Sequence, residues 1–444
     1  MDSLHTFALE SNKKFKFNFA GGDLSSDTGL LLIKEFAAKI GFEDLVNTIF
    51  KTNDTALFRR HTDPENLLQM IYQTVAAYHR DDCADELTHD PVMTAVLEKD
   101  SLASQPTLSR FFSRMDEDTL LQMNQIMRMM RKTIYSIDVP EHILLDLDST
   151  LLDTYGNQEG EAFNYHYQAH GYHPLLCFDG LTGDLLKAEL REGSQYCSKG
   201  SGQFMEDLLC ELKEDFPDTL LYMRGDSGFA SPELYDVLES KGCKYAIRLK
   251  ENTKLRELAA AKDKALFEAT MHIGDSIKYA VTYGEFMYQA GSWEHPRRVV
   301  YKIEKPYGQM IHMFTFVVTT MENLDASQVL RFYCGRGRME NFIKECKSGF
   351  GFTAVSSSSR IVNANRLQLR CLAYNLFNWF RRLTLPESMR RHCIDTLRIK
   401  LLKIAARVVH SARYIIFRLC SSCPYKQEFY ETLVSIRNLQ VQLE

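Results

Sequence analysis

At about residue 140 the sequence changes from helical to strand-type patterning. Between about residues 28 and 135, apolar residues recur at helical spacing. Beyond that region, apolar runs at 142–152, 173–191 and 219–229 have the length and composition of strands, and a helical segment precedes the third run. Strands that alternate with helices predict an α/β core that follows an all-α N-terminal region.

Two further changes of pattern divide the rest of the chain. Residues 270–321 alternate with the period of two that is typical of strands. Beyond residue 359, basic amphipathic segments at 366–383 and 397–419 predict long helices. We therefore expect five consecutive parts: a helical region (1–135), the first part of the core (136–250), a β-rich insertion (251–325), the last part of the core (326–358) and basic C-terminal helices (359–444).

The charge of the chain is unevenly distributed. The whole sequence has a formal net charge of −5, whereas residues 331–423 contain 18 Lys and Arg against 4 Asp and Glu. A basic C-terminal third on an otherwise acidic protein is typical of a protein that binds phosphates. Solvated helix faces are the alternative explanation.

Several classes of protein are not expected. Eleven scattered cysteines and a start without an apolar signal segment predict reduced thiols in a cytoplasm. Cys420 and Cys423 lack a second pair at zinc spacing, and the histidines 166, 170 and 173 lack a paired ligand set. No apolar run approaches the roughly 18 residues of a membrane helix, and no glycine-rich phosphate loop is present. We therefore expect no zinc site, no membrane partner and no nucleotide hydrolysis.

Acidic residues interrupt the apolar strands. Asp146 and Asp148 lie two residues apart in one strand, so they share a face and need a positive partner. Asp226 ends another strand, and strand ends are where α/β folds build their sites. Together with Glu340 these carboxylates form a set of oxygen ligands without clustered histidines near them in sequence. Such a set favours Mg²⁺ or Mn²⁺, and two such ions support phosphoryl transfer.

The segment "YCGRGRMENFIKECK" at residues 333–347 places polar side chains on one stripe. On a continuous helix, Tyr333, Arg336, Glu340 and Lys347 lie within about 60° of one another, beside apolar residues. The spacing therefore predicts that Glu340 points toward the interior, where its charge requires a cation. A structural ion pair and a metal site both meet this requirement.

Taken together, these motifs resemble those of the DDE transposases of bacterial insertion sequences. The likeness covers roughly residues 100–420. It rests on D-x-T at residues 148–150, on G-D-S-G-F around Asp226, and on Y-x2-R-x3-E-x6-K at residues 333–347. The resemblance implies a ribonuclease-H-like core with a β-strand insertion. It also implies cut-and-paste transposition, in which the ends of the element are nicked and joined to target DNA.

The resemblance also implies residue roles and partners. The catalytic residues would be Asp148, Asp226 and Glu340, holding two Mg²⁺ or Mn²⁺ ions, with Asp146 as a further candidate for the first position. The other members of the third motif would contact DNA: Tyr333, Arg336 and Lys347. The partners would be double-stranded inverted repeats and target DNA, bound by a homodimer at the nucleoid. A ribonuclease-H-like host nuclease, which cuts without joining, and a catalytically silent DNA-binding relative stay open.

Other DNA contacts are predicted outside the motifs. Arg110 and Arg114 lie opposite the apolar face of a short helix, which suits a DNA-facing helix and equally a connecting helix with hydrated arginines. Trp293, in a turn of the insertion, is expected to stack on a base flipped out of the duplex, with local packing as the alternative. Non-specific phosphate contacts are assigned to four cations of the C-terminal part: Arg381, Arg382, Lys400 and Lys403.

Overall fold

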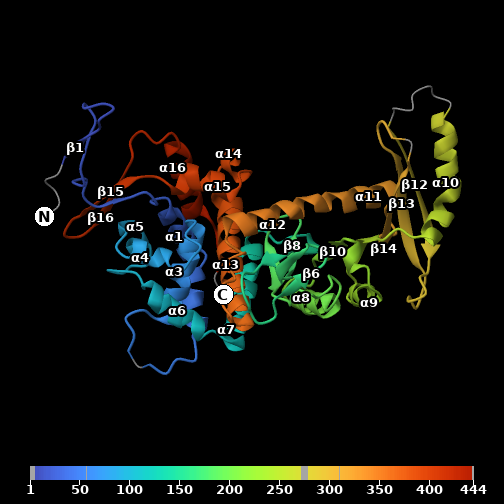
Figure 1. Ribbon diagram of the computed structural model, residues 1–444, viewed down its shortest axis with the longest axis horizontal. Helices are drawn as coiled ribbons and strands as arrows, with labels where there is room; N and C mark the ends of the chain where they lie inside the picture. Colours follow the sequence, from blue (N-terminus) through green and yellow to red (C-terminus); the bar gives the residue numbers. More distant parts are fainter. Residues whose placement is uncertain (1–5, 57, 272–278, 310, 443–444) are drawn as a thin grey trace. The chain divides into compact units, whose positions relative to one another are not determined.

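The computed structural model describes residues 6–56, 58–271, 279–309 and 311–442 (Figure 1). The chain divides into two compact units. The helical unit comprises Met1–Ile137, Glu345–Ala354 and Ile361–Glu444, and the sheet unit comprises Asp138–Lys344 and Val355–Arg360. The N-terminal and C-terminal parts of the chain therefore share one unit, while the β-rich insertion belongs to the same unit as the core.

The N-terminal part of the helical unit is mostly α-helical, as its sequence pattern predicts. Its third helix begins with a capping box, in which Thr62 and Glu65 each bond the other's backbone N–H. The helices of this part are α1 (Leu30–Lys39), α2 (Phe42–Ile49), α3 (Asp63–Val75), α4 (Cys83–Leu87), α5 (Pro91–Val96), α6 (Gln105–Ser113) and α7 (Glu117–Ile137). Two short strands, β1 (Phe7–Ala8) and β2 (Lys16–Phe17), precede them.

Helix α13 (Arg360–Thr384) belongs to the helical unit from Ile361 onward (Figure 1). It is buried along most of its length. Its Phe380 packs edge-on against Phe36 of α1, with ring centroids 5.8 Å apart. Arg366 donates from both terminal nitrogens to the Asp81 carboxylate, at 2.8 and 2.7 Å. Part of the excess positive charge of this segment is therefore neutralised inside the protein, because Arg366 forms an ion pair with Asp81.

The prediction of a long helix over residues 397–419 is wrong beyond residue 402. A short helix, α15 (Ile394–Leu397), and a π-type turn, η3 (Arg398–Leu402), are followed by two antiparallel strands, β15 (Ala406–His410) and β16 (Ile415–Leu419). These strands form a three-stranded sheet with β3 (Leu24–Ser25). Val408, Val409, Ile415 and Ile416 explain the difference, because β-branched side chains favour strands over helices. Two further helices complete this part: α14 (Glu387–Arg390) and α16 (Lys426–Asn438).

His79 makes the stability of the helical unit dependent on pH. Burial, and then the nearby charges of Arg398 and Arg370, lower the pKa of His79 to about 4. The folded chain therefore keeps His79 neutral, whereas the unfolded chain takes up a proton below about pH 6.5. The resulting stabilisation is present above pH 6.5 and is lost as the pH falls toward 4.

We expect His79→Gln to flatten the decline in Tm between about pH 7 and 5, because the unfolded variant has one proton fewer to bind. Differential scanning calorimetry measures the change. The matched control is His410→Gln, which alters an exposed histidine of the same unit. If the His79→Gln and wild-type proteins lose Tm equally over this range, protonation of His79 does not limit stability.

The sheet unit is built on one mixed eight-stranded sheet. The strand order is β12-β13-β14-β11-β10-β4-β8-β9, in which β4, β10 and β11 are parallel and the other neighbours are antiparallel. This arrangement confirms the predicted α/β core. The strands are β4 (His142–Ser149), β8 (Leu175–Asp179), β9 (Leu185–Glu189), β10 (Leu220–Gly225), β11 (Lys244–Leu249), β12 (Ala280–Tyr288), β13 (Arg297–Lys305) and β14 (Met313–Thr319).

Helices and a small second sheet complete the sheet unit. The small sheet has the order β5-β7-β6. Its strands are β5 (Leu152–Asp153), β6 (Ala162–Asn164) and β7 (Ala169–Tyr172). The helices are α8 (Ser201–Asp215), α9 (Pro232–Ser240), α10 (Thr253–Met271), α11 (Ala326–Cys334) and α12 (Arg338–Gly349), and α12 ends among residues of the helical unit.

The predicted β-rich insertion extends the core sheet. Its last strand, β14, pairs antiparallel with β11, so β12, β13 and β14 continue the sheet without a break. Val300 and Val317 of these strands pack with Val329 and Leu330 of α11 in one buried cluster. The start of the expected insertion is helical and forms α10. This helix lies along β12 (Figure 1). Alanine, lysine and glutamate dominate that segment and favour a helix.

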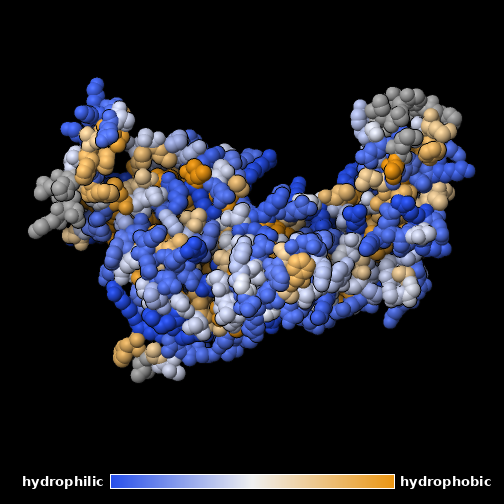
Figure 2. Space-filling model, in the orientation of Figure 1, coloured by the Kyte–Doolittle hydropathy of each residue, from blue (hydrophilic) through white to orange (hydrophobic). Residues whose placement is uncertain are grey.

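The visible surface is mostly polar. Hydrophilic residues predominate on the face that Figure 2 shows, and hydrophobic residues occur there in scattered groups. Scattered hydrophobic residues are normal on the surface of a folded protein. Within the described residues, no helix combines the length and apolar character that a membrane span requires.

Candidate active site

Asp148 and Asp226 emerge from neighbouring ends of two parallel strands. Strands β4 and β10 pair in register, with Leu147 opposite Gly225. Asp148 is the next residue along β4, and Asp226 directly follows β10. The sheet therefore brings both carboxylates to one edge, as the sequence predicts.

Arg336 of the third motif lies against both aspartates. Its Nη1 donates to Asp148 Oδ2 at 2.9 Å, and its Nη2 lies 3.7 Å from Asp226 Oδ2. The side chains of Arg336 and Asp148 are only 15% and 16% exposed. The other oxygen of Asp226 accepts from the backbone N–H of Gly228 at 2.8 Å. An arginine distant in sequence thus partly neutralises the paired carboxylates.

The negative charges of Asp226 and Glu340 act on Asp148. Burial, with a smaller contribution from the nearby carboxylates of Asp226 and Glu340, raises the pKa of Asp148 to about 6 against the lowering effect of Arg336. A raised pKa in a carboxylate surrounded by like charges means that its negative charge is incompletely compensated. The site therefore favours additional positive charge.

Glu340 is exposed, which corrects the expectation that it points toward the interior. Its neighbour Met339 is fully buried instead. The expectation assumed one continuous helix, but a 3₁₀ turn, η2 (Gly335–Gly337), separates α11 from α12. A 3₁₀ turn has about 3.0 residues per turn instead of 3.6, so it rotates the residues that follow it. Glu340 has no ion-pair partner among the described residues, which removes the structural ion pair as an explanation.

Phe342 fixes the start of α12 within the sheet unit. Its ring packs against Phe178 of β8, with centroids 5.7 Å apart. Gly183, in the turn between β8 and β9, has a φ of +77°, and a Cβ there would lie 3.0 Å from the Phe342 ring. Only glycine meets both demands without strain. The turn thus supports the helix that carries Glu340.

Asp146 forms a buried ion pair with Arg224. Both oxygens of Asp146 accept from this guanidinium at 2.6 Å, and neither residue is more than 5% exposed. Arg224 also donates to the backbone carbonyl of Phe332 at 2.8 Å, three residues before Gly335. A Cβ at Gly335 would lie 2.5 Å from Arg224 Nη1. The geometry thus favours Asp148 over Asp146 as the first acid, and Arg224 links the two central strands to the third motif.

Sequence analysis missed Tyr167 and Cys197 beside Asp148. The Tyr167 hydroxyl donates to the carbonyl of Ser149 at 3.3 Å, and the Cys197 thiol lies 3.2 Å from the Ser149 hydroxyl. Burial, and then the charge of Asp148, raise the pKa of Tyr167 to about 12. Tyr167 lies in a segment interpreted only as a polar loop, and no spacing rule connects either residue to the D-x-T motif.

Tyr333 lies near Arg336, as their three-residue spacing predicts. Burial raises the pKa of the Tyr333 hydroxyl, whereas the charge of Arg336 opposes this effect. Tyr333 packs against the buried cluster around Val329 and Leu330. Lys347 lies on α12, seven residues after Glu340, among the residues of the helical unit.

Trp293 packs inside the sheet unit. Its indole is 7% exposed and meets the rings of Tyr235 and Tyr288 edge-on, at 5.5 and 5.4 Å. The Arg297 guanidinium lies 5.5 Å from the indole centroid. These contacts match local packing, the alternative to stacking on a flipped base.

The four C-terminal cations differ in their surroundings. Arg381 donates to the Glu345 carboxylate and is 13% exposed. Lys403 pairs with Asp27 at 2.6 Å. Lys400 Nζ lies 2.9 Å from His392 Nε2, and the Arg382 guanidinium lies 6.0 Å from the Tyr135 ring centroid. Arg381 and Lys403 therefore already have carboxylate partners within the helical unit, so a phosphate would compete with these partners.

Among the described residues, no three His, Cys, Asp or Glu side chains lie close enough together to hold a metal ion. Arg336 lies against the two aspartates. The donor set nevertheless suits a hard cation, because all three predicted ligands are carboxylates. The structure thus brings two of the three predicted ligands, Asp148 and Asp226, to one edge of the sheet.

Comparisons with known proteins give one family and several distant structures. No curated protein matches the chain significantly. The chain is similar in structure to a piggyBac transposase synaptic complex with hairpin DNA, at 14% identity and a TM-score of 0.41, over 85% of this chain and 80% of that chain. It is also similar to a Mos1 transposase paired-end complex with the left transposon end, at 13% identity and a TM-score of 0.18, over 49% and 68% of the two chains. Such distant similarities assign no residue roles.

The family match covers nearly the whole chain. A family model described as Transposase DDE domain group 1 matches residues 7–441. This range includes both units, the two aspartates at the sheet edge and the third motif. The chain therefore belongs to the DDE transposase family, domain group 1, and it is a DNA transposase.

Proposed function

We propose that Asp148, Asp226 and Glu340 hold two divalent ions, Mg²⁺ or Mn²⁺, at which the transposase cuts the ends of its element and joins them to target DNA. The observation that carries this proposal is the meeting of the two aspartates with Arg336. Two strand ends thereby supply carboxylates, and the third motif supplies a guanidinium, at one place. The raised pKa of Asp148, caused mainly by burial, supports added positive charge there.

When bound, the two ions activate water or a 3′-hydroxyl and stabilise the leaving oxygen. The residues of the chain orient the reactants around them. The carboxylates supply oxygen ligands, and Asp226 is held in place by its bond from Gly228. Arg336 would be able to bind a DNA phosphate if a metal ion took its place at Asp148, because a guanidinium binds phosphate as readily as carboxylate. Tyr333 and Lys347 are proposed as further phosphate contacts.

The proposed substrate is the double-stranded inverted repeats of an insertion sequence, together with target DNA. Each reaction joins two ends, so we propose that a homodimer assembles on the DNA. In this proposal the sheet unit cuts and joins the DNA, and the helical unit makes many of the DNA contacts. The cytoplasmic, nucleoid-associated location stays a prediction.

We expect nicking of end DNA to require Mg²⁺ or Mn²⁺ and to fail with Ca²⁺. Calcium takes more ligands at longer distances, so it supports binding without productive geometry. The measurement is cleavage of a labelled duplex that carries the inverted repeat, after chelation and re-addition of each ion. Full activity after chelation would show that the carboxylates act without metal.

Strand transfer separates a transposase from a nuclease with the same core. The purified protein should join the cut 3′ ends to a supercoiled plasmid, and sequencing of the products should show target duplications of constant length. Cleavage without any joined product would favour the host-nuclease alternative.

A further inference from the structure

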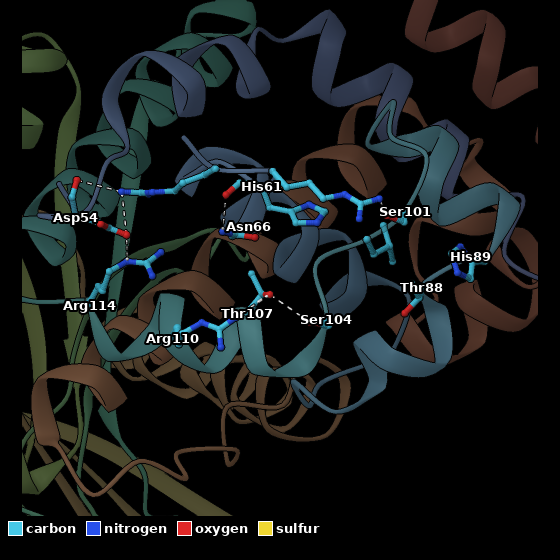
Figure 3. A pocket seen from close by; sticks show the side chains of 13 residues that line it. Asp54, His61, Asn66, Thr88, His89, Ser101, Ser104, Thr107, Arg110 and Arg114 are labelled. Atoms are coloured by element: carbon cyan, nitrogen blue, oxygen red, sulfur yellow. Dashed lines mark hydrogen bonds and ion pairs between the residues drawn. The ribbon is translucent and has the colours of Figure 1, made fainter. Parts of the chain in front are cut away.

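The helical unit contains a polar cavity that the catalytic proposal does not use. Its volume is about 640 Å³, within the roughly 300–1,000 Å³ typical of small-ligand sites. Thr107 and Arg110 of α6, and Ser104 just before this helix, face His61 and Asn66 across it (Figure 3). Arg59, Arg60 and Arg114 also line the cavity, beside Asp54 and Ser101.

Two of the four arginines of this cavity lack a carboxylate partner. Arg59 and Arg114 both pair with Asp54 and Asp63. In contrast, Arg60 donates to the Ser101 hydroxyl at 2.7 Å, and Arg110 makes a long contact with Thr107 at 3.4 Å. Among the described residues, neither Arg60 nor Arg110 forms an ion pair. Their charges are therefore available to an anion.

Asn66 presents a buried hydrogen-bond acceptor to the same cavity. The residue is 1% exposed, and its Oδ1 has no hydrogen-bond partner within the described part of the chain. Its Nδ2 makes only a 3.5 Å contact with the carbonyl of His61. A buried polar atom without a partner is costly, so its presence in a cavity lining points to a ligand that donates a hydrogen bond.

A ligand that satisfies all of these groups carries both an anionic group and a hydrogen-bond donor, such as the N–H of a base. A phosphate alone would suit the free arginines but would leave the Asn66 oxygen without a donor. A neutral base alone would leave the arginines unused. We propose that this cavity binds one nucleotide that is extrahelical in the bound DNA, with the phosphates on either side of it at Arg60 and Arg110 and its base edge at Asn66.

His61 completes the match to a base. Burial, and then the positive charge of Lys99, lower the pKa of His61. A neutral imidazole at physiological pH stacks on a base or accepts a hydrogen bond from it. The other polar side chains of the lining can form hydrogen bonds with the edge of a base, so stacking between aromatic side chains is not required. This proposal rests on the DNA-binding role of the transposase, and it assigns Arg110 and Arg114 to the walls of one defined site.

The test uses the full-length protein and end duplexes that carry 2-aminopurine at one position at a time. The fluorescence of this base rises when it leaves the stack. We expect one position to respond on binding. Arg60→Gln and Arg110→Gln should each abolish that response and weaken duplex binding about tenfold, the loss of one charge-assisted hydrogen bond. Arg437→Gln, an exposed arginine on α16 of the same unit, is the matched control and should change neither.

A second variant tests the base contact separately from the charge. Asn66→Asp places a negative charge beside the base edge and should reduce the response while circular dichroism confirms the fold. Duplex binding without a response at any position, or an unchanged response in both arginine variants, would overturn the nucleotide site alone. Failure of the wild-type protein to bind the duplex would overturn this site together with the end binding on which it rests.

Discussion

Asp148→Asn should reduce both nicking and strand transfer more than about a thousandfold, because the lost ligand charge acts on charge that develops in the transition state. We expect the same of Asp226→Asn and Glu340→Gln. End binding should change little, since these residues are proposed to hold metal and not to contact bases. The measurements are single-turnover cleavage of a labelled end duplex and a mobility-shift titration with the same duplex.

Asp153→Asn is the matched control for these variants. Asp153 is an exposed aspartate on β5 of the same unit, so its loss changes the charge equally without touching the site. Its activity should equal that of the wild type. If Glu340→Gln retains cleavage within about tenfold of wild type, which corresponds to about 1.4 kcal/mol in the barrier, Glu340 is not a metal ligand.

Arg224→Met should lower the free energy of unfolding by about 3–5 kcal/mol, because it leaves the Asp146 carboxylate buried and unpaired. Asp146 is fully buried, and Arg224 supplies both of its hydrogen bonds. The double variant Asp146→Leu, Arg224→Met should recover most of the loss, since well-packed apolar residues often replace a buried ion pair without cost. Denaturant titration measures both effects.

The cleavage rate of the double variant shows whether Arg224 only stabilises the fold or also positions the third motif. Arg224 also holds the carbonyl of Phe332, just before the third motif. If it positions that motif, kcat should stay low in the double variant even though stability returns. A loss of less than about 1 kcal/mol in Arg224→Met, as for an exposed pair, would contradict the structural role of this ion pair.

We expect the two neighbouring aspartates to respond oppositely to loss of charge. Burial raises the pKa of both carboxyl groups, but only the loss of charge at Asp146 leaves a buried arginine unpaired. The pKa of Asp148 is raised to about 6, mainly by burial, so its charge costs stability above pH 6 and the cost disappears as the pH falls toward the unfolded value of 3.8. Asp148→Asn should consequently leave stability at pH 7 unchanged or higher. Asp146→Asn should lower it, because Arg224 loses its counter-charge.

The strand pattern and the motif spacing predicted the part of the site that depends on the sheet. Asp148 and Asp226 lie at strand ends, and period-two patterning with D-x-T and G-D-S-G-F sufficed to place them there. The orientation of Glu340 was not predictable from helical spacing, because η2 changes the rotation per residue between α11 and α12. Tyr167 and Cys197 reach the site through tertiary folding alone.

The basic C-terminal third shows a second limit of sequence patterns. A count of charges does not distinguish surface cations from those that pair inside the protein. Arg366 and Arg381 bind Asp81 and Glu345, which are distant in sequence. The Val408–Val409 and Ile415–Ile416 pairs, which indicate strands, lie within a segment whose basic residues also fit a helical pattern.

Anomalous scattering from Mn²⁺ tests the central claim most directly. Crystals of the protein with its end duplex, grown with Mn²⁺, should show anomalous peaks within coordination distance of Asp148, Asp226 and Glu340, with Arg336 moved from Asp148 to a DNA phosphate. Peaks located elsewhere, or an Arg336 that still binds Asp148 while the DNA lies at the site, would contradict the three-carboxylate metal centre.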